Sequence, residues 1–235
     1  MTGPEASGRS AALFDVDGTL MDTVQLHTVA WWEALRQSGR TVAMTDIQRA
    51  IGMGSEHLLD ALAGEDRERS GDAGLKTAHD TLYAQFWSRL APLERAADLL
   101  RACAGRGLRV VLASSASGRE ADVMVRALGA GDAVHAVTTA DDVESSKPAP
   151  DVVRRALDRA GVPPERAVFV GDAVWDLRSA RKAGVTGLGV LSGGGYSREE
   201  LLDSGAARVY RSPADLLDHL DGSPIGALAA GRSPG

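Results

Sequence analysis

The stretch AALFDVDG, residues 11–18, joins an apolar run to two acidic residues and a glycine. The four apolar residues predict a buried strand, and the polar residues after them predict a turn. Because side chains two residues apart point to the same side of an extended chain, Asp15 and Asp17 share one side. Gly18 lets the backbone turn sharply behind them. The sequence therefore predicts a buried strand that ends in a pair of carboxylates.

Apolar and amphipathic segments alternate along the chain after Pro92. Short aliphatic runs predict strands, and longer amphipathic runs predict helices between them. Strands separated by helices are typical of a parallel sheet that is covered on both faces, so we predict an α/β fold. The predicted strands are 11–14, 108–113, 134–139, 167–170 and 187–191, and the predicted helices are 94–106, 118–128, 150–160, 176–183 and 214–220.

Residues 23–91 show helical patterns only, which predicts an all-helical insert after the first strand. Its predicted helices are 24–37, 46–51, 55–62 and 75–90. The core domain is then made of residues 1–22 and 92–222. Both ends of the chain are rich in small and polar residues, so we predict a disordered lead-in over residues 1–10 and a disordered tail over residues 223–235.

The composition argues against several classes of protein. A formal net charge of −6 disfavours a nucleic-acid-binding protein, because phosphate contacts need a basic surface. No apolar run approaches the roughly 20 residues of a membrane span, and the first residues lack the pattern of a signal peptide. The single cysteine, Cys103, excludes an intramolecular disulfide and suits a reducing compartment. We therefore expect a cytoplasmic protein without a nucleic-acid or membrane partner.

Polar residues follow several of the predicted strands, at the point where each strand ends. Ser114 and Ser115 follow the strand at 108–113, and Asp172 follows the strand at 167–170. Lys147 lies in the loop beyond the strand that ends near residue 139. Because parallel sheets bind ligands beyond the carboxyl ends of their strands, we expect these side chains to meet Asp15 and Asp17 at one edge of the sheet.

The residue types at this edge suit phosphoryl chemistry. Two close carboxylates repel each other, so a hard cation is implied, and oxygen ligands suit Mg²⁺. Asp172 is the natural third carboxylate, and Asp176 is a possible fourth. Phosphoryl transfer needs mainly positioning and charge stabilisation. Lys147 can supply a fixed positive charge, and Ser114 can supply a hydroxyl donor to a phosphoryl oxygen.

Four segments resemble the signature motifs of one family. They are FDVDGTLMDT at 14–23, LASS at 112–115, SKPAPD at 146–151 and VGDAVWD at 170–176. In this order they are similar to the motifs of the haloacid dehalogenase (HAD) superfamily, capped subfamily I, in the branch of phosphoglycolate phosphatases and β-phosphoglucomutases. The resemblance implies a Rossmann-like three-layer core, with residues 23–91 as a small helical cap domain.

The resemblance also implies a role for each matching residue. Asp15 would be the nucleophile that forms an aspartyl-phosphate. Asp17 would be the general acid and base, and would offer its backbone carbonyl to Mg²⁺. Ser114 matches the phosphate-binding hydroxyl, Lys147 the charge-neutralising lysine and Asp172 the metal-ligating aspartate.

Several assignments stay open between two interpretations. Asp176 is either a metal ligand or an acid that favours a helix start. Ser115 is the alternative to Ser114, which would otherwise cap the next helix. His27 is either a hinge residue behind the site or a helix-surface histidine. The complete predicted site comprises catalytic Asp15, Asp17 and Lys147, phosphate-binding Ser114, Ser115, Gly18, Thr19 and His27, and metal-ligating Asp15, Asp17, Asp172 and Asp176.

The remaining histidines and glycines receive no role from the sequence. We expect His57 and His79 to be exposed. Residues 193–195, a run of three glycines, suggest only a flexible loop near the site, because no lysine or dinucleotide pattern accompanies them.

The function predicted from these residues is a Mg²⁺-dependent phosphatase of a small phosphorylated metabolite. The presence of Asp17 favours phosphoryl chemistry over dehalogenation, because an alkoxide leaving group needs a proton. A β-phosphoglucomutase-like phosphomutase is the first alternative, although Gly52-Met53-Gly54-Ser55 carries no arginine where mutases of this branch have one, and Arg49 lies upstream. The second alternative is a non-catalytic binding protein on the same scaffold. We expect a monomer or a homodimer.

Overall fold

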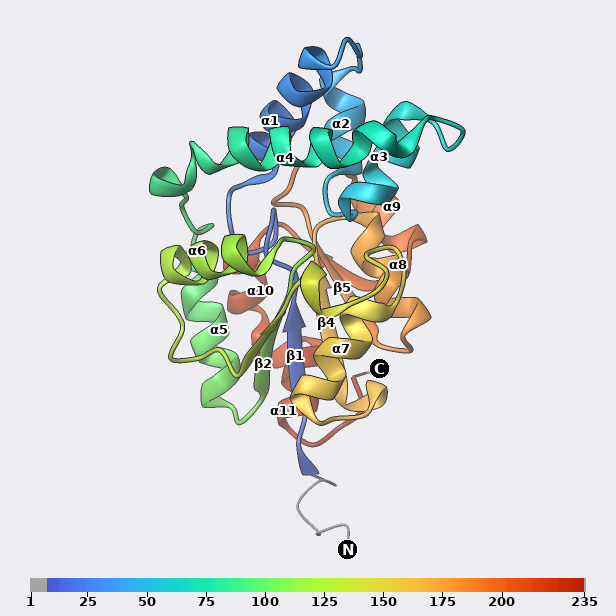
Figure 1. Cartoon of the computed structure of the whole chain (residues 1–235). Helices are drawn as coiled ribbons and strands as arrows, with labels where there is room; N and C mark the ends of the chain where they lie inside the picture. Colours follow the sequence, from blue (N-terminus) through green and yellow to red (C-terminus); the bar gives the residue numbers. More distant parts are fainter. Residues whose placement is uncertain (1–7, 235) are drawn as a thin grey trace, which may run out of the picture.

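The computed structural model describes residues 8–234 and forms a single parallel sheet flanked by helices (Figure 1). The strand order is β3-β2-β1-β4-β5-β6, which confirms the predicted α/β fold. The first seven residues of the predicted lead-in lie outside the described part of the chain. The strands are β1 (Ala11–Phe14), β2 (Arg109–Ala113), β3 (Ala136–Thr138), β4 (Ala167–Gly171), β5 (Thr186–Val190) and β6 (Ala206–Tyr210).

Alternate side chains of the central strand β1 enter two separate hydrophobic layers. Ala12 and Phe14 pack on one face, against α5, α6, α10 and α11. Ala11 and Leu13 pack on the other face, against α7 and α8. Because both faces of a strand are buried here, its residues are apolar without a break. The helices of the core are α5 (Ala96–Gly105), α6 (Gly118–Leu128), α7 (Asp151–Ala160), α8 (Val174–Lys182), α9 (Arg198–Asp203), α10 (Pro213–Asp218) and α11 (Pro224–Ala229).

A helical unit stands over the carboxyl ends of the strands (Figure 1). It contains α1 (Val24–Gln37), α2 (Met44–Ala50), α3 (Ser55–Ala63) and α4 (Asp72–Ala84), with short 3₁₀ turns at Arg69–Gly71 and Trp87–Arg89. Its core is separate from those of the sheet and includes Trp31, Leu35, Ile47 and Leu58. Within residues 23–91 the structure contains helices and turns but no strand, as the sequence predicted.

Two chain segments that lie side by side connect this unit to the sheet. The Asp22 amide donates to the Ala91 carbonyl at 3.0 Å, and the Leu93 amide donates to the Leu20 carbonyl at 2.8 Å. The predicted boundaries, after residue 22 and before residue 92, fall at this pairing. We refer to residues 23–91 as the cap.

Strand β6 and helix α9 were not predicted from the sequence, and neither was helix α11. Strand β6 lies at the edge of the sheet and exposes Ala207 and Arg208, so it lacks the continuous apolar run of the buried strands. Helix α9 has only six residues, too few for a periodic pattern. Its start was nevertheless readable, because the Ser197 hydroxyl and the Glu200 carboxylate form a capping box.

The predicted disordered tail over residues 223–235 is wrong for most of its length. Helix α11 occupies Pro224–Ala229, and its Ile225 and Leu228 side chains are buried in the layer that includes α5 and α10. Ser223 accepts a hydrogen bond from the Gly226 amide, and proline stands at the first helical position. Ser-Pro at a helix start was therefore the informative signal, and the small-residue composition was misleading.

None of the described helices is long and apolar enough to cross a membrane. The cytoplasmic location and the monomer or homodimer state stay predictions.

We predict that Ile225→Ala destabilises the protein by about 2–4 kcal/mol, because it removes a fully buried side chain from a packed layer. Urea unfolding followed by circular dichroism measures the change. Arg232→Ala, at an exposed position of the same segment, is the control. Equal stability of wild type and Ile225→Ala would mean that α11 is not docked.

Candidate active site

The loop after β1 folds tightly around the two acids. The amides of Leu20 and Met21 both donate to the Val16 carbonyl at 2.9 Å, and Gly18 has a φ of +75°. The Asp15 amide donates to the Val170 carbonyl at 2.9 Å, so the end of β4 holds the nucleophile candidate in place. Glycine is needed at position 18, because that φ lies in the left-handed region.

Lys147 reaches Asp15 from the loop after β3. Its side chain is fully buried, and its ammonium group contacts Asp15 Oδ1 and lies 2.8 Å from Asp176 Oδ1. Although burial opposes the charged form, these two carboxylates raise the pKa of Lys147. The Ser179 hydroxyl on α8 donates to the Ala149 carbonyl at 2.6 Å and so ties the lysine loop to the core. The structure therefore brings the predicted lysine and nucleophile together.

Three carboxylates form a buried cluster at the ends of β1 and β4. Oxygens of Asp15, Asp172 and Asp176 lie within 4.8 Å of one another. Thr19 Oγ1 lies 3.2 Å from Asp15 Oδ2 and 3.0 Å from Asp172 Oδ1, so its single proton can serve either acid. Burial and the Asp176 charge raise the pKa of Asp15 to about 7, and the same two causes raise the pKa of Asp172 well above its usual range.

The cluster fits a hard divalent cation. One lysine faces three acids, and burial together with the charge of Asp176 raises the pKa values of Asp15 and Asp172, so a bound cation would favour their ionised forms. Oxygen ligands at this spacing suit Mg²⁺. Asp15, Asp172 and Asp176 would hold the ion, which agrees with the metal-ligand interpretation of Asp176. Asp176 Oδ2 accepts a hydrogen bond from the Ala173 amide at 3.1 Å, so Asp176 also caps α8.

The Asp17 side chain lies apart from that cluster, so only its backbone carbonyl remains as the predicted metal contact. Asp17 Oδ1 accepts from the Thr23 hydroxyl at 2.6 Å and lies 3.1 Å from His27 Nε2. Burial opposes the charged form of both residues. The charge and the hydrogen bond of His27 nevertheless lower the pKa of Asp17, and those of Asp17 raise the pKa of His27. The structure therefore places His27 behind Asp17 and buries it, contrary to the helix-surface alternative.

The two serines after β2 point in different directions. Ser114 is fully buried, and its Oγ accepts from the Ala116 amide at 3.0 Å. Ser115 lines the cavity above Asp15 and donates to the Gly52 carbonyl of the cap at 3.3 Å. Both stay predicted phosphate-binding residues, and the one that borders the cavity is Ser115.

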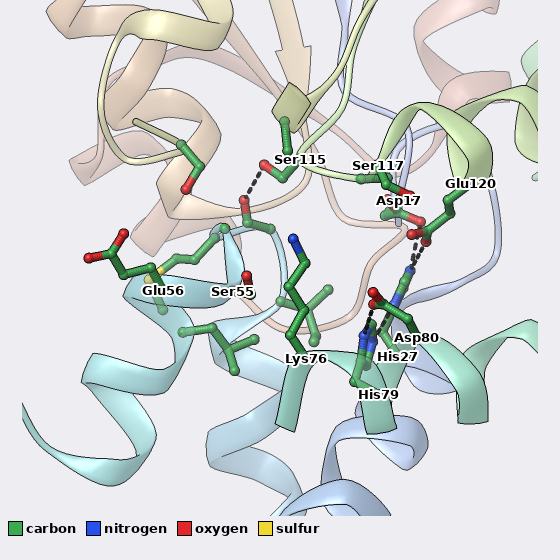
Figure 2. A pocket seen from close by; sticks show the side chains of 18 of the residues that line it. Asp17, His27, Ser55, Glu56, Lys76, His79, Asp80, Ser115, Ser117 and Glu120 are labelled. Carbon is green, nitrogen blue, oxygen red and sulfur yellow. Dashed lines mark hydrogen bonds and ion pairs between the residues drawn. The ribbon is translucent and has the colours of Figure 1, made fainter. Parts of the chain in front are cut away.

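His79 is buried, so the prediction of an exposed residue is wrong. Its Nε2 lies 3.1 Å from His27 Nδ1, its Nδ1 lies 3.0 Å from Asp80 Oδ1, and its ring stacks on Trp31 at 4.3 Å between centroids. Figure 2 shows Asp17, His27, His79 and Asp80 in one connected row. A single histidine on an amphipathic helix carries no signal for such a contact.

Two residues of the loop after β5 also belong to the site, although the sequence suggested only flexibility there. The Ser192 hydroxyl donates to the Gly18 carbonyl at 2.7 Å. A Cβ atom at Gly193 would stand 1.8 Å from Asp172 Oδ2, so glycine is needed for this close approach. The glycine run was the available signal, and close packing rather than flexibility is its cause.

A cavity of about 220 Å³ lies between the sheet and the cap (Figure 2). Asp15 and Asp17 line it from the core, and residues 51–56 and His79 line it from the cap. Asp15, which contacts the buried Lys147 and belongs to the carboxylate cluster, thus shares one cavity with the pair of Asp17 and His27. This arrangement can bind and attack a phosphate ester.

The family model of haloacid dehalogenase-like hydrolases matches residues 10–184. The chain belongs to this family. It is 31% identical to a phosphoglycolate phosphatase of Rhodospirillum rubrum, covering 95% of this chain and 96% of that protein. It is 32% identical to the protein CbbY of Cereibacter sphaeroides, covering 88% and 93% of the two chains.

A crystal structure of a hydrolase from Pseudomonas syringae is 35% identical and superposes with a TM-score of 0.86, over 91% of this chain and 99% of that one. The predicted membership in the HAD superfamily and the predicted class, a HAD-like phosphatase, are confirmed.

We predict that Gly193→Ala lowers the affinity for Mg²⁺ roughly 10- to 100-fold, because its methyl group displaces the Asp172 carboxylate. Isothermal titration calorimetry with MgCl₂ measures this affinity. Gly195→Ala is the matched control, since the nearest atom to its added Cβ is the Gln48 carbonyl oxygen at 3.7 Å. Equal Mg²⁺ affinities of the two variants would contradict the role of Gly193.

We predict that His79 makes folding stability depend on pH. Burial lowers the pKa of His79 to about 4, so the folded protein resists protonation of this residue while the unfolded chain takes up the proton near pH 6.5. Its contribution is present above pH 6.5 and is lost as the pH falls towards 4. When the pH falls from 7 to 5, the free energy of unfolding of wild type should decrease by about 2 kcal/mol more than that of His79→Phe.

Urea unfolding at the two pH values measures this difference, and His135→Phe, at an exposed histidine, serves as the control. The same pH dependence in wild type and His79→Phe would show that the buried histidine is not the cause.

Proposed function

We propose that this HAD-like phosphatase hydrolyses a small phosphorylated metabolite through an aspartyl-phosphate on Asp15, with Mg²⁺ as cofactor. The observation that carries the proposal is the buried contact of Asp15 with Lys147, beside the carboxylates of Asp172 and Asp176. A lone buried carboxylate would take up a proton. The positive charge of Lys147 opposes the rise in pKa that burial and Asp176 cause, and so favours the ionised, nucleophilic form of Asp15.

In the first step an Asp15 carboxylate oxygen attacks the phosphorus atom, and the bond between phosphorus and the ester oxygen breaks. The leaving oxygen takes a proton from Asp17. Thr23 and His27 occupy Asp17 Oδ1, which leaves Oδ2 for the substrate among the described contacts. Because the pKa of Asp17 is lowered, the proton that it donates comes from His27, whose pKa is raised and whose Nε2 lies 3.1 Å from Asp17 Oδ1. Asp17 passes this proton to the leaving oxygen, and the proton taken from water in the second step restores it.

In the second step Asp17 removes a proton from water, and the water oxygen attacks the phosphorus of the aspartyl-phosphate. Asp15 leaves as a free carboxylate, and inorganic phosphate is released. Lys147 stabilises the negative charge in both steps. When bound, Mg²⁺ neutralises charge on the phosphoryl group and on the attacking carboxylate.

Hydrolysis is supported over phosphomutase activity by the direction of Arg49. Its guanidinium lies 2.5 Å from Glu200 Oε1 and 3.0 Å from the Gly195 carbonyl, both on the core, and Arg49 does not line the cavity. The cap loop from Gly52 to Ser55 lines the cavity and carries no cationic side chain. A non-catalytic role is disfavoured, because Asp15, Asp17 and Lys147 are all present and adjoin the cavity or one another.

We predict that the wild-type protein releases nitrophenol from p-nitrophenyl phosphate in the presence of Mg²⁺, and that Asp15→Asn reduces kcat by at least about 10³-fold. Removal of the metal with EDTA should abolish turnover, and added MgCl₂ should restore it. Absorbance at the nitrophenolate maximum measures the rate.

Glu33→Gln on the cap helix α1 controls for a general effect of removing an acid. Turnover that survives in Asp15→Asn would refute the nucleophile. Sugar phosphate that isomerises in the presence of a bisphosphate primer, without release of inorganic phosphate, would favour the mutase instead.

A further inference from the structure

We propose that Glu120 determines substrate specificity by accepting a hydrogen bond from a hydroxyl of the leaving group. The substrate class is then a sugar or polyol monophosphate that carries no second anionic group. The inference rests on the proposed function, because it assigns the part of the cavity that receives the leaving group.

Glu120 is a buried acid in the first turn of α6, and its side chain is only 9% exposed. It lines the cavity beside Asp17 (Figure 2). Oε1 accepts no hydrogen bond from the described residues, and its nearest cationic neighbour is His27 Nε2 at 3.4 Å. A buried carboxylate oxygen without a donor is unfavourable, so a donor supplied by the substrate would stabilise it.

The walls of the cavity beyond the reacting groups carry mostly negative charge. Four acids and one ammonium group line this part, and no described arginine does. Burial raises the pKa of one of these acids, Glu120, to about 7, and His27 with its raised pKa borders the cavity on the Asp17 side. His79 adds no charge at neutral pH, since burial lowers its pKa to about 4. A second phosphate or a carboxylate on the leaving group would be repelled here. The four acids are Glu56, Asp80, Glu120 and Glu144, and the ammonium group belongs to Lys76.

The remaining polar lining is rich in hydroxyl groups. Ser55, Ser115, Ser117 and Ser146 border the same cavity. Hydroxyls of a sugar or polyol can both donate to Glu120 and exchange hydrogen bonds with these serines. The volume of about 220 Å³ is small compared with the roughly 300 Å³ or more of typical ligand pockets, so the leaving group is small.

This substrate class differs from that of a relative named phosphoglycolate phosphatase, whose substrate carries a carboxylate next to the phosphate ester. The difference makes the inference testable with matched pairs of substrates. Glycerol 3-phosphate and 3-phosphoglycerate differ in a hydroxymethyl group and a carboxylate. Fructose 1-phosphate and fructose 1,6-bisphosphate differ in a second phosphate.

The experiment measures kcat and KM for both pairs and for p-nitrophenyl phosphate, in wild type, Glu120→Gln and Glu120→Met. Wild type should favour the uncharged member of each pair at least about tenfold in kcat/KM. Glu120→Met should raise KM for the uncharged member about tenfold. Glu120→Gln removes one negative charge and should therefore lower the ratio of kcat/KM between the uncharged and the anionic member of each pair. For both variants the loss of kcat/KM on p-nitrophenyl phosphate, whose leaving group has no further hydroxyl, should be smaller than the loss on the uncharged member of each pair.

Glu165→Gln, at an exposed position before β4 and therefore at the opposite edge of the sheet, is the control. If Glu120→Met does not fold by circular dichroism, the isosteric Glu120→Gln decides alone. A wild-type preference for the anionic members would overturn the inference, and so would an equal loss of kcat on every substrate, which would mean that Glu120 only positions His27. Absence of turnover on all five compounds would instead overturn the proposed function.

Discussion

The contact of the Lys147 ammonium with Asp15 and Asp176 is the interaction on which the rest of the site depends. Several charges share a space from which water is excluded, and burial of charge is unfavourable unless each group finds a partner. The topology brings these groups together: β1 and β4 are neighbouring parallel strands, so Asp15 and Asp172, which follow them, lie side by side at the edge of the sheet. The lysine then enters from the loop after β3, two strands away from β1 in the sheet.

This crowding of charge explains where the chain uses glycine near the site. A Cβ atom at Gly18 or Gly193 would lie within 2.5 Å of the Asp172 carboxylate, and one at Gly171 would lie 2.4 Å from the Asp176 Cβ. Each of these glycines leaves the space that one acid needs. The acids and the glycines therefore belong to a single packing arrangement, which links glycines of two loops and of the end of β4 to one charge cluster.

Residues at strand ends could be predicted from the sequence, whereas residues on helices could not. Asp15, Asp172 and Lys147 follow apolar runs or lie in the loop beyond one, and parallel strands deliver such residues to one edge. Glu120 and His79 occupy ordinary positions on amphipathic helices, so their approach to Asp17 depends on how α6 and the cap pack. Edge strand β6 and the buried helix α11 escaped prediction for a related reason, since their burial is set by neighbours that are distant in sequence.

The core and the cap contribute different side chains to the site. The charge cluster of Asp15, Asp172 and Asp176 comes entirely from the core, so none of its carboxylates is supplied by the cap. The cap reaches this chemistry through His27, whose ring joins Asp17 of the core to His79 of α4. Glu120 lies on the core side of that junction, 3.4 Å from the same ring. In the proposed reaction a leaving group would meet Glu120 beside Asp17, and one histidine from the cap lies within 3.4 Å of both acids.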